Sequence, residues 1–403
     1  MRIELPANFL WGAALSSYQT EGGNLNTDWA EWEHRLTQEC GQACNHYALY
    51  KQDFDLARSL NLNSVRISLE WARIFPAPGV CCEEVLGHYS DVLDSLRVRN
   101  LSPLVTLHHF TNPVWFAQNH GWHSTAQCGH FLQYLSRAVQ AFCDKVDYWI
   151  ILNEPLVYIY NGYIRGVWPP GLTSFNDARK ALKNMTSVYL EGYQEIHRIY
   201  KNSRRVPRVS ISQHLRFFSP CTQGVRFLNN ISAQFRHTMF NMALLEYLTK
   251  KRALDFIGVN YYCKEYVRFK GIVGRECTQP HHTDRKNYPQ WYVDAHAFYE
   301  LLMGLKRFHT PVIVTENGSA EESDQMYRDY LLTHLQAVAR ALSQGVPIAG
   351  YFWWSLLDNF EWDKGFDCRF GLAEVDYRNF SRKLRPYALT YAKICKENAI
   401  EID

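Results

Sequence analysis

The chain has 403 residues, of which 47% are hydrophobic and 21% charged, so it can bury a core and is not a disordered protein. Its 43 Lys and Arg residues nearly balance its 40 Asp and Glu residues, which argues against a nucleic-acid partner. No long apolar run is present, and Glu4 and Pro6 interrupt the start, where a signal peptide needs an apolar stretch. We therefore expect a globular protein with no nucleic-acid or membrane partner.

The 11 cysteines are an odd number scattered along a large chain. This pattern favours free thiols in a reducing compartment over a disulfide framework. No second cysteine pair completes a four-ligand metal set, so we expect no metal and no cofactor. The combination predicts a cytoplasmic protein.

Short β-branched or aromatic runs alternate with longer amphipathic stretches along the whole chain, which predicts β-α alternation. The predicted strands are Phe9–Gly12, Ser64–Ser68, Leu104–Leu107, Tyr148–Leu152, Val209–Ser212, Phe256–Val259, Val312–Thr315 and Ile348–Trp353. The predicted helices are His46–Asn61, Leu86–Asn100, Gln127–Val146, Ala178–Tyr200, Tyr292–Phe308 and Gln325–Gln344. Each β-α unit averages about 48 residues, the scale of an eight-fold α/β barrel with elaborated loops. No linker-like tract divides the chain, so we predict a single (β/α)8 TIM barrel over residues 1–403.

Two connections of this barrel are harder to interpret. The region Phe217–Leu254 has two helical stretches within one connection, and Lys264–Tyr288 is polar and rich in turn formers. We predict a loop for Lys264–Tyr288, after the sixth strand. Loops at the carboxyl ends of barrel strands build active sites, so an elaborate loop there is expected of an enzyme.

Two carboxylates follow predicted strands. Glu154 comes after the fourth strand and Glu316 after the seventh. Because strand ends of a barrel share one mouth, these side chains can face each other. Two carboxylates that flank a bond can serve as general acid/base and nucleophile in breaking a glycosidic bond. Pro155 and Gly318 give each carboxylate a turn that presents its side chain.

Several motifs carry a resemblance to a known family. They are Phe9-Leu10-Trp11-Gly12-Ala13-Ala14, Tyr18-Gln19-Thr20-Glu21-Gly22, Asn153-Glu154-Pro155, Thr315-Glu316-Asn317-Gly318, and the segment from Trp354 to Trp362. Long, ordered and spread from end to end, they resemble glycoside hydrolase family 1, in its β-glucosidase/β-galactosidase branch.

The resemblance implies a retaining mechanism. Glu316 attacks the anomeric carbon, while Glu154 first protonates the departing oxygen and then activates water, with the two carboxyls about 5 to 5.5 Å apart. It also implies that Glu154 is held protonated, and that a cation keeps Glu316 ionised. Arg66 matches that cation and Tyr262 matches the tyrosine that hydrogen-bonds the nucleophile. Asn260 lies in the same segment as Tyr262 and is included as a supporting residue.

The same resemblance implies a sugar-binding set. Gln19, His109, Asn153 and Glu361 match hydroxyl-binding positions, Trp354 and Trp362 match sugar-contacting tryptophans, and Phe370 matches an aromatic of the pocket or is a core residue. His108 and Tyr261 are expected to have structural roles.

The implied activity is hydrolysis of terminal non-reducing β-D-glucosides, with galactosides and fucosides also within scope. The partner is a small β-glycoside or oligosaccharide, and the oligomeric state stays open. A 6-phospho-β-glycosidase is disfavoured because Glu361 would repel phosphate. A non-catalytic glycan-binding relative is disfavoured because Glu154 and Glu316 are both present. Transglycosylation, in which a sugar or alcohol replaces water, stays open.

Overall fold

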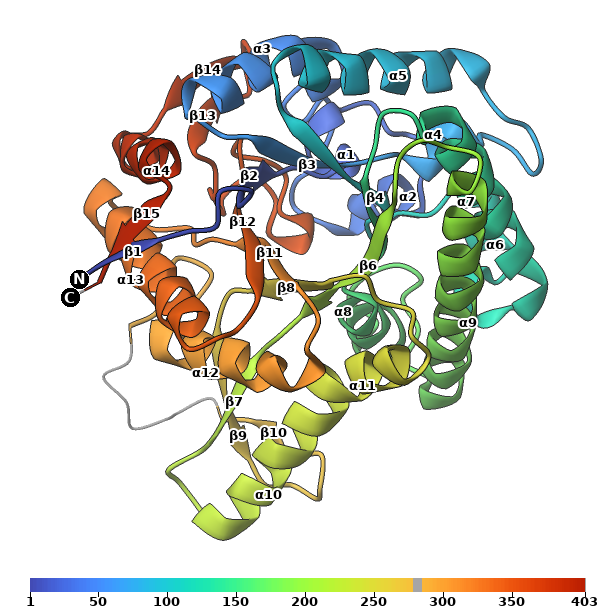
Figure 1. Ribbon diagram of the computed structural model, residues 1–403. Helices are drawn as coiled ribbons and strands as arrows, with labels where there is room; N and C mark the ends of the chain where they lie inside the picture. Colours follow the sequence, from blue (N-terminus) through green and yellow to red (C-terminus); the bar gives the residue numbers. More distant parts are fainter. Residues whose placement is uncertain (278–284, 403) are drawn as a thin grey trace.

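A closed barrel of eight parallel strands forms the centre of the computed structural model, which describes residues 1–277 and 285–402 (Figure 1). In order around the barrel the strands are β2 (Leu10–Ala14), β3 (Ser64–Ser68), β4 (Ser102–His108), β5 (Tyr148–Asn153), β6 (Arg208–His214), β8 (Ile257–Tyr261), β11 (Val312–Asn317) and β12 (Ile348–Trp354), which pairs with β2. Each of the eight predicted strands overlaps one of these. The predicted TIM barrel is therefore confirmed.

Helices surround the barrel (Figure 1). The six predicted helices correspond to α3 (His46–Ser59), α5 (Glu83–Val98), α7 (Cys128–Phe142), α9 (Phe175–Tyr200), α12 (Ala295–Leu305) and α13 (Asp324–Ser343). The carboxyl-terminal α14 (Pro386–Glu397) joins this ring, and short helices α1 (Ser17–Glu21), α2 (Asp28–Trp32), α4 (Trp71–Ile74), α6 (Val114–Gln118) and α8 (Pro155–Ile159) occupy the loops. None of the helices in the described part of the chain has the length and apolar character that crossing a membrane requires.

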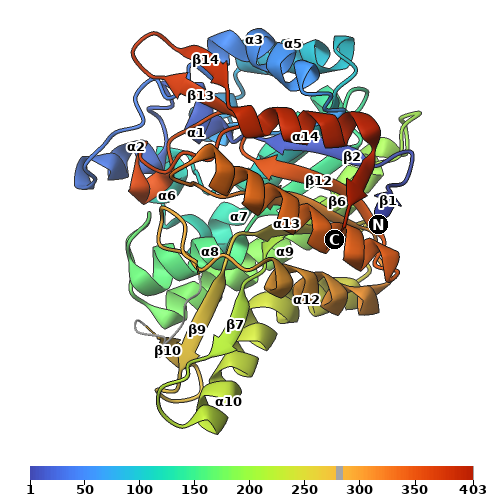
Figure 2. The ribbon, with the colours of Figure 1, turned by 90° about the vertical axis from the view of Figure 1, so that its left-hand side faces the viewer.

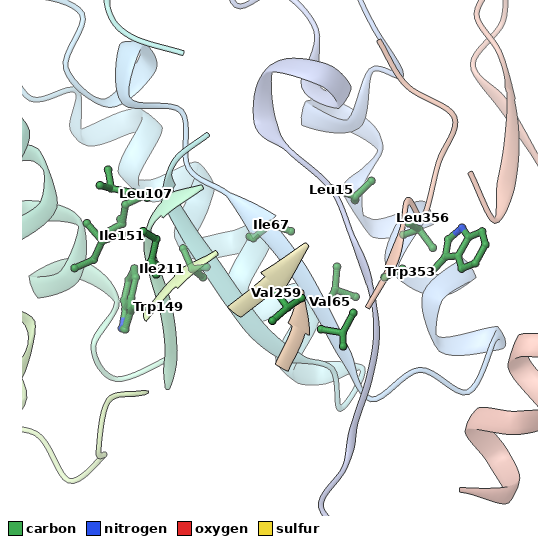
Figure 3. Packing of buried hydrophobic residues seen from close by; sticks show 14 of the residues in the cluster. Leu15, Val65, Ile67, Leu107, Trp149, Ile151, Ile211, Val259, Trp353 and Leu356 are labelled. Atoms are coloured by element: carbon green, nitrogen blue, oxygen red, sulfur yellow. The ribbon is translucent and has the colours of Figure 1, made fainter. Parts of the chain in front are cut away.

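The core has two layers because successive side chains of a strand point to opposite faces. Outward-pointing residues such as Val65, Ile67 and Trp149 pack under the helices (Figure 3). A smaller cluster, consisting of Leu104, Ile150, Phe256, Ile313 and Phe352, is separate from that layer and fills the barrel interior. Toward the carboxyl ends of the strands, beyond this apolar cluster, the inward-pointing positions carry polar side chains such as Arg66 and Asn153.

The predicted loop Lys264–Tyr288 is wrong in part. Residues Lys264–Arg268 form β9 and Arg275–Glu276 form β10, and these strands pair in the order β10-β9-β7 with β7 (Phe217–Pro220). Together with α10 (Arg226–Arg236) they form a lobe that projects from the barrel (Figure 2). Polar, partly exposed strands lack the apolar signal on which prediction depends, and their pairing is non-local. The connection Phe217–Leu254 contains, after β7, the helices α10, η5 (His237–Met242) and α11 (Ala243–Lys250).

The expectation of free thiols is wrong for one pair of cysteines. Cys221 and Cys277 form a disulfide across a sequence separation of 56 residues, and the other nine thiols are free. Cys221 follows β7 and Cys277 follows β10, so the bond closes the lobe. Strand pairing creates this proximity, and cysteine spacing alone does not reveal it.

Candidate active site

The backbone presents both predicted catalytic carboxylates at the carboxyl ends of strands. Glu154 directly follows β5 and adopts a left-handed conformation with φ 43°, immediately before Pro155, which starts α8. Proline is favourable there because the first helical residue needs no N–H donor. Glu316 lies in β11, where the pairing register with β8 shifts between Val314 and Glu316. Such an irregularity re-aims a side chain.

Arg66 and Tyr262 hold the carboxylate of Glu316. Arg66 Nη1 forms an ion pair with Glu316 Oε1, and Tyr262 donates its hydroxyl to Oε2 at 2.5 Å. Arg66 is fully buried on β3, and it also donates to Thr106 Oγ1 at 3.0 Å and to Asn153 Oδ1 at 2.7 Å. Both oxygens of Glu316 therefore accept strong hydrogen bonds, which orient the carboxylate and favour its charged form.

Two asparagines connect the carboxylates. Asn260 Nδ2 donates to Glu154 Oε1 at 2.7 Å and to Asn153 Oδ1 at 3.2 Å. Asn260 Oδ1 in turn accepts from Thr315 Oγ1 at 2.7 Å. Asn153 thus receives hydrogen bonds from both Arg66 and Asn260. The structure brings all five residues predicted for catalysis and its support into one buried network.

His214 belongs to this network and is absent from the sequence-based set. It is the last residue of β6, and its Nδ1 lies 3.2 Å from Glu154 Oε1. The signal that singled out Glu154 and Glu316, a functional side chain at the end of a barrel strand, applies equally to His214.

The pKa values of the two carboxyls run in the opposite order to the expectation. Burial raises the pKa of Glu316 to about 7, with Arg66 lowering it and the charge of Glu154 raising it further. Burial also raises the pKa of Glu154, but the charge and hydrogen bond of His214 and the hydrogen bond of Asn260 bring it below its usual value. Interacting carboxyls titrate as a pair. Glu154 and Glu316 therefore share one proton over the pH range that lies between their two pKa values.

The predicted sugar-binding residues gather next to the carboxylates. Gln19 Nε2 donates to Phe360 O at 2.8 Å and lies 3.3 Å from Glu361 Oε2. The ring of His109 stacks near Trp354 and Trp362, with centroids 5.9 and 6.2 Å away. His109 Nε2 lies 3.3 Å from Asn153 Nδ2, while its buried Nδ1 has no partner among the described residues. Directional polar groups beside flat aromatic rings suit a hydroxylated ring with apolar faces.

Burial raises the pKa of Glu361 to about 8, with the negative charge of Glu316 as the second cause. Without a ligand, Glu361 is therefore mostly protonated at pH 7. The repulsion of phosphate expected from its charge is correspondingly weaker than the sequence suggests.

Three aromatic or histidine positions lie behind the site. Phe370 is 1% exposed and packs edge-on against Tyr262, with centroids 6.1 Å apart, so it supports that tyrosine from the core. Tyr261 stacks on Phe298 at 4.6 Å, on the helix side of the barrel. His108 lies 3.1 Å from Asn112 Oδ1 through its Nε2. His108 and Tyr261 thus have the structural surroundings expected for them.

The family model for glycosyl hydrolase family 1 matches residues 1–243 and 214–400. The chain belongs to this family. Beta-glucosidase A of Thermotoga maritima is 28% identical, with 99% of both chains covered. Beta-galactosidase of Pyrococcus woesei is 27% identical, with 92% of both chains covered. A solved structure, the beta-glycosidase from Pyrococcus horikoshii, is 32% identical with a TM-score of 0.92, covering 100% of this chain and 97% of that one.

The chain is thus a glycoside hydrolase with the TIM barrel of this family. The relatives' names differ in the sugar they specify, glucoside in one and galactoside in another. Family membership therefore gives the class of enzyme and leaves the sugar open.

Proposed function

We propose that the protein is a retaining β-glycosidase that hydrolyses terminal non-reducing β-D-glucosides, with galactosides and fucosides as further substrates. The observation that carries the proposal is the buried pair Glu154 and Glu316, joined through Arg66, Asn153 and Asn260. A retaining mechanism needs Glu154 protonated and Glu316 ionised at its start. Because the pKa order in the free site is the reverse, the shared proton must move from Glu316 to Glu154 when the substrate binds.

In the proposed reaction, Glu316 attacks the anomeric carbon while Glu154 gives its proton to the departing oxygen. A covalent glycosyl-enzyme forms, and the aglycone leaves. Glu154, now a carboxylate, takes a proton from the attacking water, which releases the sugar and restores Glu316. Arg66 and Tyr262 hold Glu316 in line for the first step and stabilise it when it departs in the second.

The first test is hydrolysis of a panel of aryl β-glycosides, with the configuration of the released sugar followed by NMR. We expect turnover of the β-glucoside and initial release of the β-anomer. Initial release of the α-anomer would show an inverting mechanism, and absence of turnover on every glycoside would favour a non-catalytic glycan-binding protein.

The second test separates unphosphorylated from 6-phosphorylated substrates. Glu361→Ala should lower kcat/KM for unphosphorylated glycosides by roughly ten-fold to a hundred-fold, since sugar hydroxyls left buried without a hydrogen-bond partner cost about 1 to 3 kcal/mol. Discrimination against the 6-phosphoglycoside should shrink in the same variant. Preference of the unaltered protein for the phosphorylated substrate would instead establish a 6-phospho-β-glycosidase.

A further inference from the structure

His214 is a buried histidine whose one hydrogen bond within the described residues goes to Glu154. Nδ1 lies 3.2 Å from Glu154 Oε1, and Nε2 is buried without a partner in that part of the chain. The side chain therefore has no other polar contact there to explain its orientation. Its placement at the end of β6 aims the imidazole at the acid/base carboxyl.

Aromatic rings fix the plane of this imidazole. The Tyr262 ring stacks on it at 5.9 Å with an interplanar angle of 25°, and the Phe240 ring meets it edge-on at 6.1 Å. Tyr262 is the same residue that donates to Glu316. The packing thus couples the orientation of His214 to the residues that hold both carboxylates.

Asn260 and His214 contact the same oxygen of Glu154. Asn260 Nδ2 at 2.7 Å and His214 Nδ1 at 3.2 Å both reach Oε1, and among residues 1–277 and 285–402 no hydrogen bond reaches Oε2. A carboxyl that is hydrogen-bonded at one oxygen keeps the other oxygen available for proton transfer.

We propose that His214 is a positioning residue for Glu154: with Asn260 it holds Oε1, so that Oε2 faces the glycosidic oxygen and, later, the attacking water. This inference rests on the proposed function. It assigns a task to a side chain that does not itself touch the reacting atoms.

The charges around His214 are compatible with this role. Just after β5 it faces Glu154, and just after β8 it faces the ring of Tyr262, whose pKa burial raises. From η5 it meets the uncharged Phe240 ring. Arg216, two residues further along, is paired with Glu265 at 2.8 Å. Glu154 is thus the anion that His214 meets directly, while Arg66 adds a second positive charge that lowers the pKa of Glu154.

The second half of the reaction needs Glu154 as a carboxylate, and that is the form His214 stabilises. The Nδ1–H of His214 donates to the anion that is produced when Glu154 gives up its proton. Hydrogen bonding to the charged form of a carboxyl lowers its pKa. Removing His214 therefore makes Glu154 easier to protonate at low pH.

The experiment uses His214→Asn and His214→Phe, because asparagine retains an N–H donor and phenylalanine retains none. In both, the acid limb of the kcat/KM profile should move to higher pH by about one unit or more. Substrates with poor leaving groups should lose more rate than activated aryl glycosides, and this difference should be larger in His214→Phe. His334→Asn is the matched control, since His334 is a buried histidine on α13 that makes no hydrogen bond to either carboxyl within the described residues.

A double-variant comparison separates positioning from a purely structural role. In a Glu154→Ala background, tested on activated aryl glycosides, adding His214→Asn should no longer shift the profile. An unshifted acid limb in folded His214→Asn and His214→Phe would overturn the role of His214. The same shift in the Glu154→Ala background would overturn it as well. Absence of hydrolysis by the unaltered protein would refute the proposed function instead.

Discussion

Arg66 has no exposed surface, yet its guanidinium meets four acceptors: Thr106, Asn153, the Thr315 carbonyl and Glu316. A buried cation is tolerated only where its donors are satisfied and an anion lies beside it. The same ion pair fixes the orientation of the Glu316 carboxylate. The buried charges of Arg66 and Glu316 thus satisfy each other, and each candidate catalytic carboxyl is held by neighbours from other strands.

Glu316→Gln should lower hydrolysis by roughly 10³-fold or more while leaving the fold intact, because the amide is nearly isosteric but is no longer an anionic nucleophile. Steady-state rates with an aryl β-glucoside and a circular dichroism melt measure the two effects. Glu322→Gln, six residues on and exposed, is the control and should retain full activity. Comparable activity in both variants would remove Glu316 from the nucleophile role.

The pH profile should be bell-shaped, because the active form is the carboxyl pair with one proton. That form is lost as pH rises through about 7, the value to which burial raises the pKa of Glu316. It is lost on the acid side below the usual range for glutamate, because the pKa of Glu154 is lowered. These limbs belong to the pair rather than to single residues. Measuring kcat/KM across pH tests this, and an alkaline limb two or more units above 7 would contradict it.

The chain just beyond β11 packs closely against the backbone at the end of β12. A Cβ built at Gly318, just beyond β11, would lie 1.9 Å from the backbone carbonyl oxygen of Trp354 at the end of β12. The sequence suggested that Gly318 is required for a sharp turn, and the structure shows that it is required for space. One strand end carries Glu316 and the other carries Trp354, so the spacing of the strand ends sets the distance between these two side chains.

Gly318→Ala should therefore lower both stability and kcat/KM. Overpacking of this kind costs about 1 to 3 kcal/mol, and the backbone must shift where the site is built. Gly87→Ala in the exposed middle of α5 is the control, because a Cβ there meets no atom within 4 Å. It should stabilise the protein by up to about 1 kcal/mol without changing kcat/KM. Unchanged kcat/KM and melting temperature in Gly318→Ala would show that the strand ends can move apart without loss of stability or activity.

The two ends of the chain are tied into one body. Strand β1 (Arg2–Glu4) pairs antiparallel with β15 (Ala399–Glu401), which places the termini side by side (Figure 1). The final hairpin, β13 (Ala373–Asp376) and β14 (Ser381–Leu384), is anchored to α3 by a fully buried ion pair between Arg382 and Asp53 at 2.7 Å. These links close the ring of β-α units around the barrel.

Asp53→Asn should be strongly destabilising, by about 3 to 5 kcal/mol, because it leaves the buried cation Arg382 without its counter-charge. Urea unfolding monitored by tryptophan fluorescence gives the change, while kcat/KM of the folded fraction should stay close to normal since the pair is remote from the carboxylates. Asp376→Asn breaks the exposed pair with Arg378 and should leave stability unchanged within error. Equal effects in the two variants would refute the importance of burial.

The sequence by itself determined the barrel and singled out Glu154 and Glu316 as the candidate catalytic carboxylates. Buried parallel strands are continuous apolar runs with a local signal, and β3 (Ser64–Ser68) has the predicted bounds. Glu154 and Glu316 follow such runs within motifs of neighbouring residues. Patterns of this kind depend on a few consecutive side chains, so they can be recognised without knowing the fold.

The tertiary structure decided what depends on contacts between distant segments. It paired Cys221 with Cys277, formed the lobe from polar strands, and placed His214 beside Glu154, which reversed the expected order of the carboxyl pKa values. A pKa reflects every charge and donor that folding brings within a few ångströms, and those neighbours come from other strands. The two candidate catalytic carboxyls were therefore predictable from local sequence, while the groups that shift their pKa values were set by how the barrel closes.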